Sequence, residues 1–258
     1  MDIGSVMVAY SALFGLALGS FMNVCIYRIP LKKSIISPPS SCPKCGKKIK
    51  FHDNIPLISY LLLLGKCRHC RNPLAWHYPA VEAMTGVLSV VLFIRYGPTY
   101  QYILYLLFTA ALVTISFIDL HHKIIPDVLS LSGIAGGWAA SFVLDDISWV
   151  DSLIGIIAGG GILFLVAVIY ERITGREGMG GGDIKLLAMI GAWMGWRHLH
   201  LIILLSSLAG AIVGSFFLLI AGKGFRFRIP FGPFLSLGAL LCLFFGPELM
   251  TWYFHLFQ

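Results

Sequence analysis

The sequence predicts an all-α polytopic membrane protein with about eight transmembrane or partly spanning helices. Three observations lead to this fold class. Of the 258 residues, 58% are apolar and only 12% are charged, whereas soluble domains are about 45–50% apolar and about 25% charged. The mean hydropathy is +0.85. Apolar runs near the length needed to cross a bilayer, about 20 residues, recur along the chain.

Seven of these runs predict membrane spans, at residues 3–26, 78–94, 100–118, 128–144, 152–170, 199–221 and 229–257. An eighth run, 184–196, has only 13 residues. At about 1.5 Å per residue it reaches roughly 20 Å, which is short of a hydrocarbon core of about 30 Å. We interpret it either as a short span flanked by a loop at membrane depth or as a re-entrant helix.

The distribution of basic residues predicts the orientation. No Lys or Arg precedes the first span, which indicates a retained anchor with its N-terminus outside. Alternating spans then place 17 of the 19 Lys and Arg in inside segments, at 27–77, 119–127, 171–185 and 222–228. This asymmetry is what the positive-inside rule expects. The net charge of +7 therefore reports topology and does not call for a nucleic-acid partner.

The only long polar stretch, 29–77, predicts a small cytosolic insert between the first and second spans. It holds two C-x2-C pairs with 21 residues between them, Cys42 with Cys45 and Cys67 with Cys70. Two such pairs can supply four thiolates to a tetrahedral structural zinc, which then has no open position for catalysis. Two disulfides or a thiol redox pair are the alternatives, and a reducing cytosol disfavours the disulfides.

Four acidic residues near predicted span ends require an explanation, because ionisable groups near hydrocarbon are costly and mark functional sites. Asp119 ends the third span and Asp183 begins the short helix, both on the inside. Two facing carboxylates can share a proton, so that one activates a water while the other polarises a carbonyl. The alternative makes Asp183 a helix N-cap and Asp119 an interface residue. Asp127 is expected to be an N-cap, and Glu82 has no obvious partner.

Asp183 follows three glycines, Gly180, Gly181 and Gly182. This run does not complete a P-loop, and no strand precedes it as a dinucleotide-binding fold requires. Glycine allows another backbone to come close. We therefore expect an extended peptide substrate to approach these three residues, as in strand addition.

At this point the sequence resembles the bacterial type IV prepilin peptidases, aspartic membrane proteases with the GxGD signature. The matching stretches are the two cysteine pairs, "GSFMNVCIYRIP" (19–30), "YPAVEAMTG" (78–86), "FIDLHHKIIPD" (117–127), "GMGGGDIKLLAMIGAW" (178–193) and "IPFGPFLSLGA" (229–239). They are spread over most of the chain in a specific order. The resemblance implies that Asp119 and Asp183 are catalytic and that the substrate is a type IV prepilin or a type II secretion pseudopilin.

The resemblance further implies a bacterial inner-membrane enzyme that cleaves a short basic leader at the cytosolic face. Many such proteins also N-methylate the new N-terminus with S-adenosylmethionine. Asn23, Arg28 and Glu82 are candidates for that second site, because they lie in matching stretches beside the insert. The expected domains are a first helix (1–28), a zinc insert (29–77) and a helical peptidase domain (78–258).

Two other functions remain open from the sequence. One is a peptidase that has lost methylation. The other is a membrane scaffold or proton-coupled transporter, in which the buried acids relay protons and the zinc-stabilised insert docks a partner.

Overall fold

The computed structural model describes residues 3–175, 180–221 and 229–255. Residues 178 and 179 of the matching stretch 178–193, the predicted cytosolic segment 222–228 and the last residues of the final span lie outside the described residues. The chain divides into two compact units, Met1–Thr114 and Ile115–Gln258. Each unit is described by itself.

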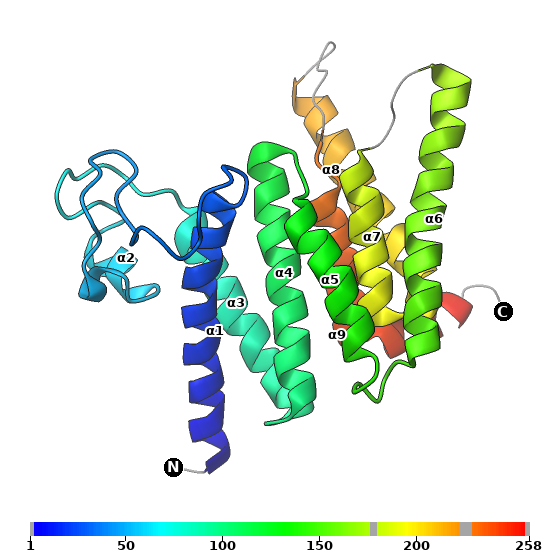
Figure 1. The fold of residues 1–258 in the computed structure, drawn as a ribbon, viewed down its shortest axis with the longest axis horizontal. Coiled ribbons are helices and arrows are strands. Elements are labelled where there is room, and N and C mark those ends of the chain that lie inside the picture. Colours follow the sequence, from blue (N-terminus) through cyan, green and yellow to red (C-terminus); the bar gives the residue numbers. More distant parts are fainter. Residues whose placement is uncertain (1–2, 176–179, 222–228, 256–258) are drawn as a thin grey trace. The chain divides into compact units, whose positions relative to one another are not determined.

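In the first unit, α1 (Ile3–Arg28) packs side by side with α3 (His77–Tyr96) (Figure 1). Two glycines of α1 allow the close approach. A Cβ added to Gly15 would lie 2.5 Å from Ser89 Cβ, and one added to Gly19 would lie 2.8 Å from Glu82 Cα. The hydroxyl of Ser89 donates to the Ser11 carbonyl at 2.7 Å. This packing holds the end of α1 close to the start of α3, and the insert connects these two helix ends.

The insert contains only short helices, η1 (Phe51–Asp53) and α2 (Ile58–Leu62). Its two cysteine pairs sit in hairpins of the same design. An isolated bridge closes each hairpin, Ser41 with Lys48 and Lys66 with Pro73. In each, the backbone turns through positive φ four residues after the first cysteine, at Gly46 and Arg71. The same backbone path at both sites presents two pairs of thiols in the same way.

The second unit contains the end of α4 (Tyr100–His122), α5 (Asp127–Ala140), α6 (Trp149–Thr174), α7 (Gly181–Met194), η2 (Trp196–His198), α8 (Leu199–Ala221) and α9 (Gly232–His255). Helix α7 lies between α5 and α6 (Figure 1) and also contacts α9. Its residues from Leu186 to Trp193 are buried. A Cβ on Gly191 would run into the backbone carbonyl of Gly155, so α6 and α7 touch through bare backbone.

The predicted fold class is confirmed, and several helix boundaries differ from the predicted ones by a few residues. Six of the described helices are long and apolar enough to span a membrane, namely α1, α3, α4, α6, α8 and α9. Helix α7 has 14 residues, close to the predicted 13, but it begins at Gly181 and not at Asp183. The prediction of a full span over 128–144 was wrong in length, because α5 ends at Ala140 after 14 residues. The backbone leaves the helix there although the following residues are still apolar.

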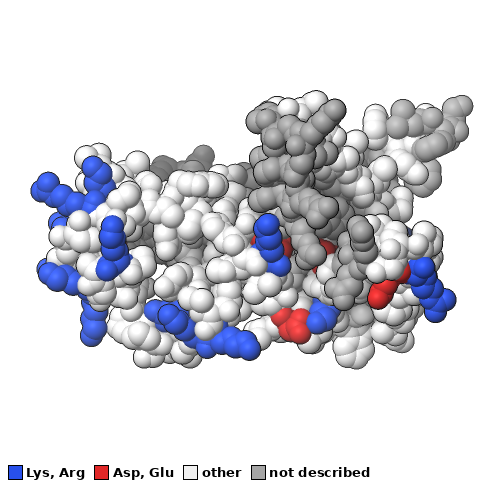
Figure 2. Space-filling model, turned by 90° about the horizontal axis from the view of Figure 1, so that it is seen from above, with Lys and Arg blue, Asp and Glu red and all other residues white. Residues whose placement is uncertain are grey.

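Charged side chains are unevenly distributed on the molecule. Figure 2 shows Lys and Arg side chains gathered over the insert, with few acidic side chains among them. These side chains belong to the basic segment 27–77 on which the predicted orientation depends.

Candidate active site

The first candidate catalytic residue, Asp119, lies in the last turn of α4 and is buried, with 5% of its surface exposed. Its Oδ2 accepts a hydrogen bond from the backbone N–H of Gly232 at 3.0 Å. Gly232 is the first residue of α9, whose first amides have no partner within the helix. The positive end of the α9 dipole therefore holds the Asp119 carboxylate in one orientation.

The second candidate, Asp183, lies half-buried in the first turn of α7. It lies close enough to Asp119 for the two carboxylates to repel each other electrostatically. Ile125, in the link between α4 and α5, lies close both to Gly182, which precedes Asp183, and to Gly232, which binds Asp119. A Cβ on Gly182 would lie 2.9 Å from Ile125 Cβ, and one on Gly232 would lie 3.3 Å from Ile125 Cδ1. The fold thus brings together the two acids that the sequence singled out.

The three glycines before Asp183 have different surroundings. Gly180 is the N-cap residue of α7 and is extended, with φ −74° and ψ 141°. Gly181 and Gly182 already belong to the helix. A Cβ would meet nothing within 4 Å at Gly181, whereas Gly182 is pressed against Ile125. Open backbone is therefore found at Gly180 and Gly181, and Gly182 has a packing reason to be glycine.

Asp127 does not play the predicted capping role. Pro126 is the N-cap residue of α5, and Asp127 is the first residue of the helix. Its Oδ1 accepts from Lys185 Nζ at 2.6 Å, and both side chains are well exposed. The prediction failed because the helix begins one residue earlier than expected, at Asp127, whose carboxylate pairs with Lys185 of α7, two residues beyond Asp183. This pair ties α5 to α7 next to the candidate site.

The residues that sequence reasoning missed are Gly232 and Ile125. Gly232 lies in a stretch recognised only by resemblance, 113 positions from Asp119. No residue pattern indicates its contact, because a glycine amide carries no chemical signature in a sequence.

The four insert cysteines form a second site. Their Sγ atoms all lie within 4.8 Å of one another, and no disulfide joins them. The Sγ atoms of Cys42 and Cys70 are 3.8 Å apart. A tetrahedral zinc with arms of about 2.3 Å has sulfur–sulfur edges of about 3.8 Å, so the arrangement fits this metal.

The environment of one of these thiols, that of Cys67, lowers its pKa and so favours metal binding. Hydrogen bonds from the backbone amides of Cys70 and His69 lower the pKa of the Cys67 thiol to about 6. Thiolates and not thiols bind metals, so this lowered pKa favours the form of Cys67 that binds a metal. The four cysteines can hold a metal ion.

Asn23, Arg28 and Glu82 line one cavity of about 180 Å³ within the first unit. The guanidinium of Arg28 donates to the carbonyls of Ser34 at 2.9 Å and Pro38 at 2.6 Å, so it anchors the start of the insert. Glu82 Oε2 accepts from the Leu57 N–H at 2.8 Å. The fold therefore gathers all three residues that were proposed for methyl transfer.

Comparisons with known proteins agree with the geometry. Residues 13–96 match the model of the bacterial peptidase A24 N-terminal domain, and residues 106–215 match that of the type IV leader peptidase family. The chain is 37% identical to a prepilin leader peptidase/N-methyltransferase of Aeromonas hydrophila, over 93% of this chain and 91% of that protein. Proteins of the same name from Pseudomonas aeruginosa and Legionella pneumophila are 38% and 36% identical, over 95% and 93% of this chain and 93% and 92% of those proteins. No solved structure matches the chain.

Proposed function

Because the chain belongs to the type IV leader peptidase family, we propose that it cleaves the leader from type IV prepilins or type II secretion pseudopilins and N-methylates the new N-terminus. The observation that carries the peptidase half is the meeting of Asp119 and Asp183 within the second unit. The relatives' name supports the methyltransferase half.

In the proposed hydrolysis, the two carboxylates share one proton. The ionised one takes a proton from a water as that water attacks the scissile carbonyl carbon. The protonated one gives its proton to the carbonyl oxygen, which forms a tetrahedral intermediate. As the carbon–nitrogen bond breaks, the carboxyl that took the water's proton passes it to the leaving amine, and a hydroxyl of the intermediate returns a proton to the other carboxylate. Since the Gly232 amide occupies Oδ2 of Asp119, we assign the water to Oδ1 of that residue.

The substrate reaches this pair as an extended backbone. In an α-helix each backbone carbonyl is hydrogen-bonded within the helix and shielded by neighbouring side chains. The substrate around the scissile bond must therefore be unwound before its carbonyl can reach the two acids. A Cβ on Gly181 would meet nothing within 4 Å, and one on Gly180 would meet only the Asp183 carboxylate, at 3.8 Å. Polar backbone at this depth is stable only beside water or protein. We therefore place the approaching strand of the substrate along these glycines.

We also propose the organisation and orientation of the chain. Residues 1–28 form the first membrane helix, 29–77 a zinc insert and 78–258 the helical peptidase domain. The N-terminus faces the periplasm, while the insert and the dyad face the cytosol, where the basic leader of the substrate is found. The basic surface of the insert in Figure 2 supports this orientation.

We assign the metal of the insert as zinc, bound by Cys42, Cys45, Cys67 and Cys70. The evidence is the sulfur spacing and the absence of a disulfide among the described cysteines. An insert with two short helices has little core of its own, so a metal supplies stability that packing does not. The methyl donor for the second activity is S-adenosylmethionine.

The test uses the purified full-length protein in detergent with a prepilin, with and without S-adenosylmethionine, and reads the products by mass spectrometry. The expected products are a free leader and a mature pilin, which gains one methyl group only when the donor is present. A mature pilin that never gains the methyl group would identify a peptidase without the second activity. An intact prepilin would refute the peptidase proposal and return the scaffold or transporter as the better hypothesis.

A further inference from the structure

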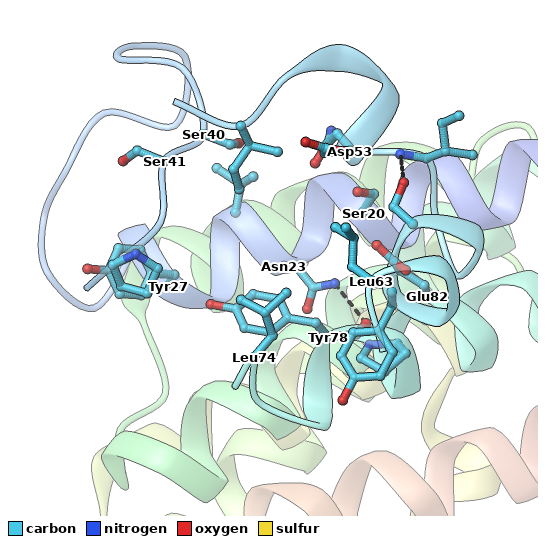
Figure 3. Close-up of a pocket in the computed structure, with 18 of the residues that line it drawn as sticks. Ser20, Asn23, Tyr27, Ser40, Ser41, Asp53, Leu63, Leu74, Tyr78 and Glu82 are labelled. Carbon is cyan, nitrogen blue, oxygen red and sulfur yellow. Dashed lines mark hydrogen bonds between the residues drawn. The ribbon is translucent and has the colours of Figure 1, made fainter. Parts of the chain in front are cut away.

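A cavity within the first unit is lined by neither of the two candidate catalytic acids. It is bounded by the end of α1, the start of α3 and the insert, and every lining residue belongs to the first unit. Figure 3 shows Asn23 and Tyr78 on the helix side of this cavity, with Ser40, Ser41 and Asp53 on the insert side. The dyad lies in the second unit, so another role must explain the groups gathered here.

Asn23 carries an acceptor that lacks a partner. The side chain is buried, with 6% of its surface exposed. Its Nδ2 donates to the Tyr78 carbonyl at 3.0 Å, which fixes the amide (Figure 3). Its Oδ1 is buried without a hydrogen bond to any described residue. A buried oxygen left unpaired costs about 1–3 kcal/mol. A ligand that brings an N–H donor recovers this energy.

Glu82 adds a negative charge. Its carboxylate accepts from the Leu57 N–H and from the Ser20 hydroxyl, both neutral groups. Among the described residues, it forms no ion pair. The nearest basic lining residue, Arg28, is committed to the carbonyls of Ser34 and Pro38. A half-buried carboxylate without a cation favours a positively charged ligand.

The rest of the lining suits a soft cation. Three tyrosines line the cavity, Tyr27, Tyr60 and Tyr78. The face of an aromatic ring attracts onium cations, and the attraction strengthens where water is excluded. The other acid of the lining, Asp53, is held by Arg68 through a bidentate ion pair. The uncompensated charge of the cavity is therefore that of Glu82.

We propose that this cavity is the methyl-donor site and that Glu82 and Asn23 bind the cationic methionine end of S-adenosylmethionine. This inference rests on the methyltransferase half of the proposed function and adds its location. The donor carries an ammonium with N–H groups and a sulfonium; an N–H can pair with Asn23 Oδ1, and the positive charge can pair with Glu82. In the transfer, the carbon–sulfur bond breaks and a carbon–nitrogen bond forms to the neutral pilin amine. The sulfonium becomes a thioether, and the nitrogen loses one proton to solvent.

The first test measures binding of S-adenosylmethionine alone to the purified full-length protein, by equilibrium dialysis with labelled donor. Glu82→Gln removes the charge, and Asn23→Leu removes the acceptor at similar size. We expect the dissociation constant to rise about tenfold or more for Glu82→Gln and about fivefold for Asn23→Leu. Glu248→Gln, an exposed acid on α9, is the matched control and should bind as wild type. Zinc content and thermal unfolding check that each variant is folded.

A second test needs no variant. An 8-azido analogue of the donor is photo-crosslinked to the wild-type protein, and the labelled peptide is identified by mass spectrometry. The label is expected within residues 20–82 and should be lost with excess unlabelled donor. A label that appears only within residues 115–258 would overturn the proposal.

The outcomes separate this inference from the function on which it rests. If wild type methylates pilin while folded Glu82→Gln and Asn23→Leu bind the donor normally, the location is wrong and the proposed function stands. The N-terminal ammonium of the cleaved pilin is also a cation with N–H donors, so it could bind Glu82 and Asn23 in place of the methyl donor. If the variants lose affinity only for that peptide, the cavity binds the acceptor and the donor assignment is wrong. If wild type neither binds the donor nor methylates, both proposals fail.

Discussion

Replacing Gly232 with alanine tests the position of Asp119 without touching either acid. A Cβ at this residue would lie 2.7 Å from Asp119 Oδ2 and 3.3 Å from Asp119 Cγ. An ordinary contact between carbon and oxygen is about 3.4 Å or longer. The carboxylate must therefore move by roughly 0.7 Å, and its hydrogen bond to the Gly232 amide lengthens or breaks.

The size of the effect follows from how steeply catalysis depends on geometry. A displacement of about 1 Å at a reacting group can cost about a hundredfold in rate. A shift of about 0.7 Å should lower the cleavage rate roughly tenfold to hundredfold. Alanine is the better helix former by about 0.5–1 kcal/mol, so the helix itself is not weakened. We expect a slow enzyme with a nearly unchanged unfolding temperature.

The assay is the initial rate of prepilin cleavage together with thermal unfolding in detergent. Gly238→Ala is the matched control, because it lies in the same helix and its Cβ would come 2.6 Å from Ser206 Oγ, which does not touch the dyad. That variant should unfold at lower temperature but lose less activity per folded molecule. Wild-type cleavage by Gly232→Ala, or equal losses in the two variants, would refute this account of Asp119.

Three further predictions concern the metal, the surface ion pair and the helix contact. The purified protein should contain one zinc per chain, and a strong chelator should expose residues 29–77 to proteolysis. Cys42→Ser should lose the metal, whereas the control Cys242→Ala should keep it. Full protease resistance without metal would contradict the zinc site. Asp127→Asn should keep its cleavage activity and lose less than about 1 kcal/mol of stability, because the ion pair with Lys185 is exposed; an inactive variant would give Asp127 a role in catalysis. Gly191→Ala should lower the free energy of unfolding by about 1–3 kcal/mol or more, and the unfolding temperature with it, since its Cβ meets the Gly155 backbone. Gly161→Ala should not, because a Cβ there has open space around it.

Much of this fold was predictable because span-forming helices are determined locally. Among the described residues, hydropathy located the six helices that are long enough to span a membrane, and even the unusual shortness of α7 followed from the 13-residue run. The end of α5 was missed, because Phe142 and Val143 are apolar yet lie beyond the helix. Hydropathy reports which side chains tolerate lipid and not where the backbone leaves the helix.

The candidate site was predictable in its chemistry and less so in its geometry. Charge counting assigned Asp119 and Asp183 to the same side of the membrane, which already suggested a pair, and the resemblance implied that both are catalytic. The hydrogen bond from Gly232 was not predictable, because it depends on how α9 meets α4 across 113 positions. The ion pair of Asp127 was missed for the same reason, since its partner Lys185 belongs to another helix. Contacts of this kind come from packing and leave no local pattern.

The central claim is that Asp119 and Asp183 act as one catalytic unit. The most direct test is single-turnover cleavage of a prepilin by Asp119→Asn, Asp183→Asn and the double variant, each checked for folding and zinc content. Both single variants should lose cleavage by several orders of magnitude, and the double variant should be no slower than either, because residues that act together are not additive. Substantial cleavage by either folded single variant would contradict the dyad.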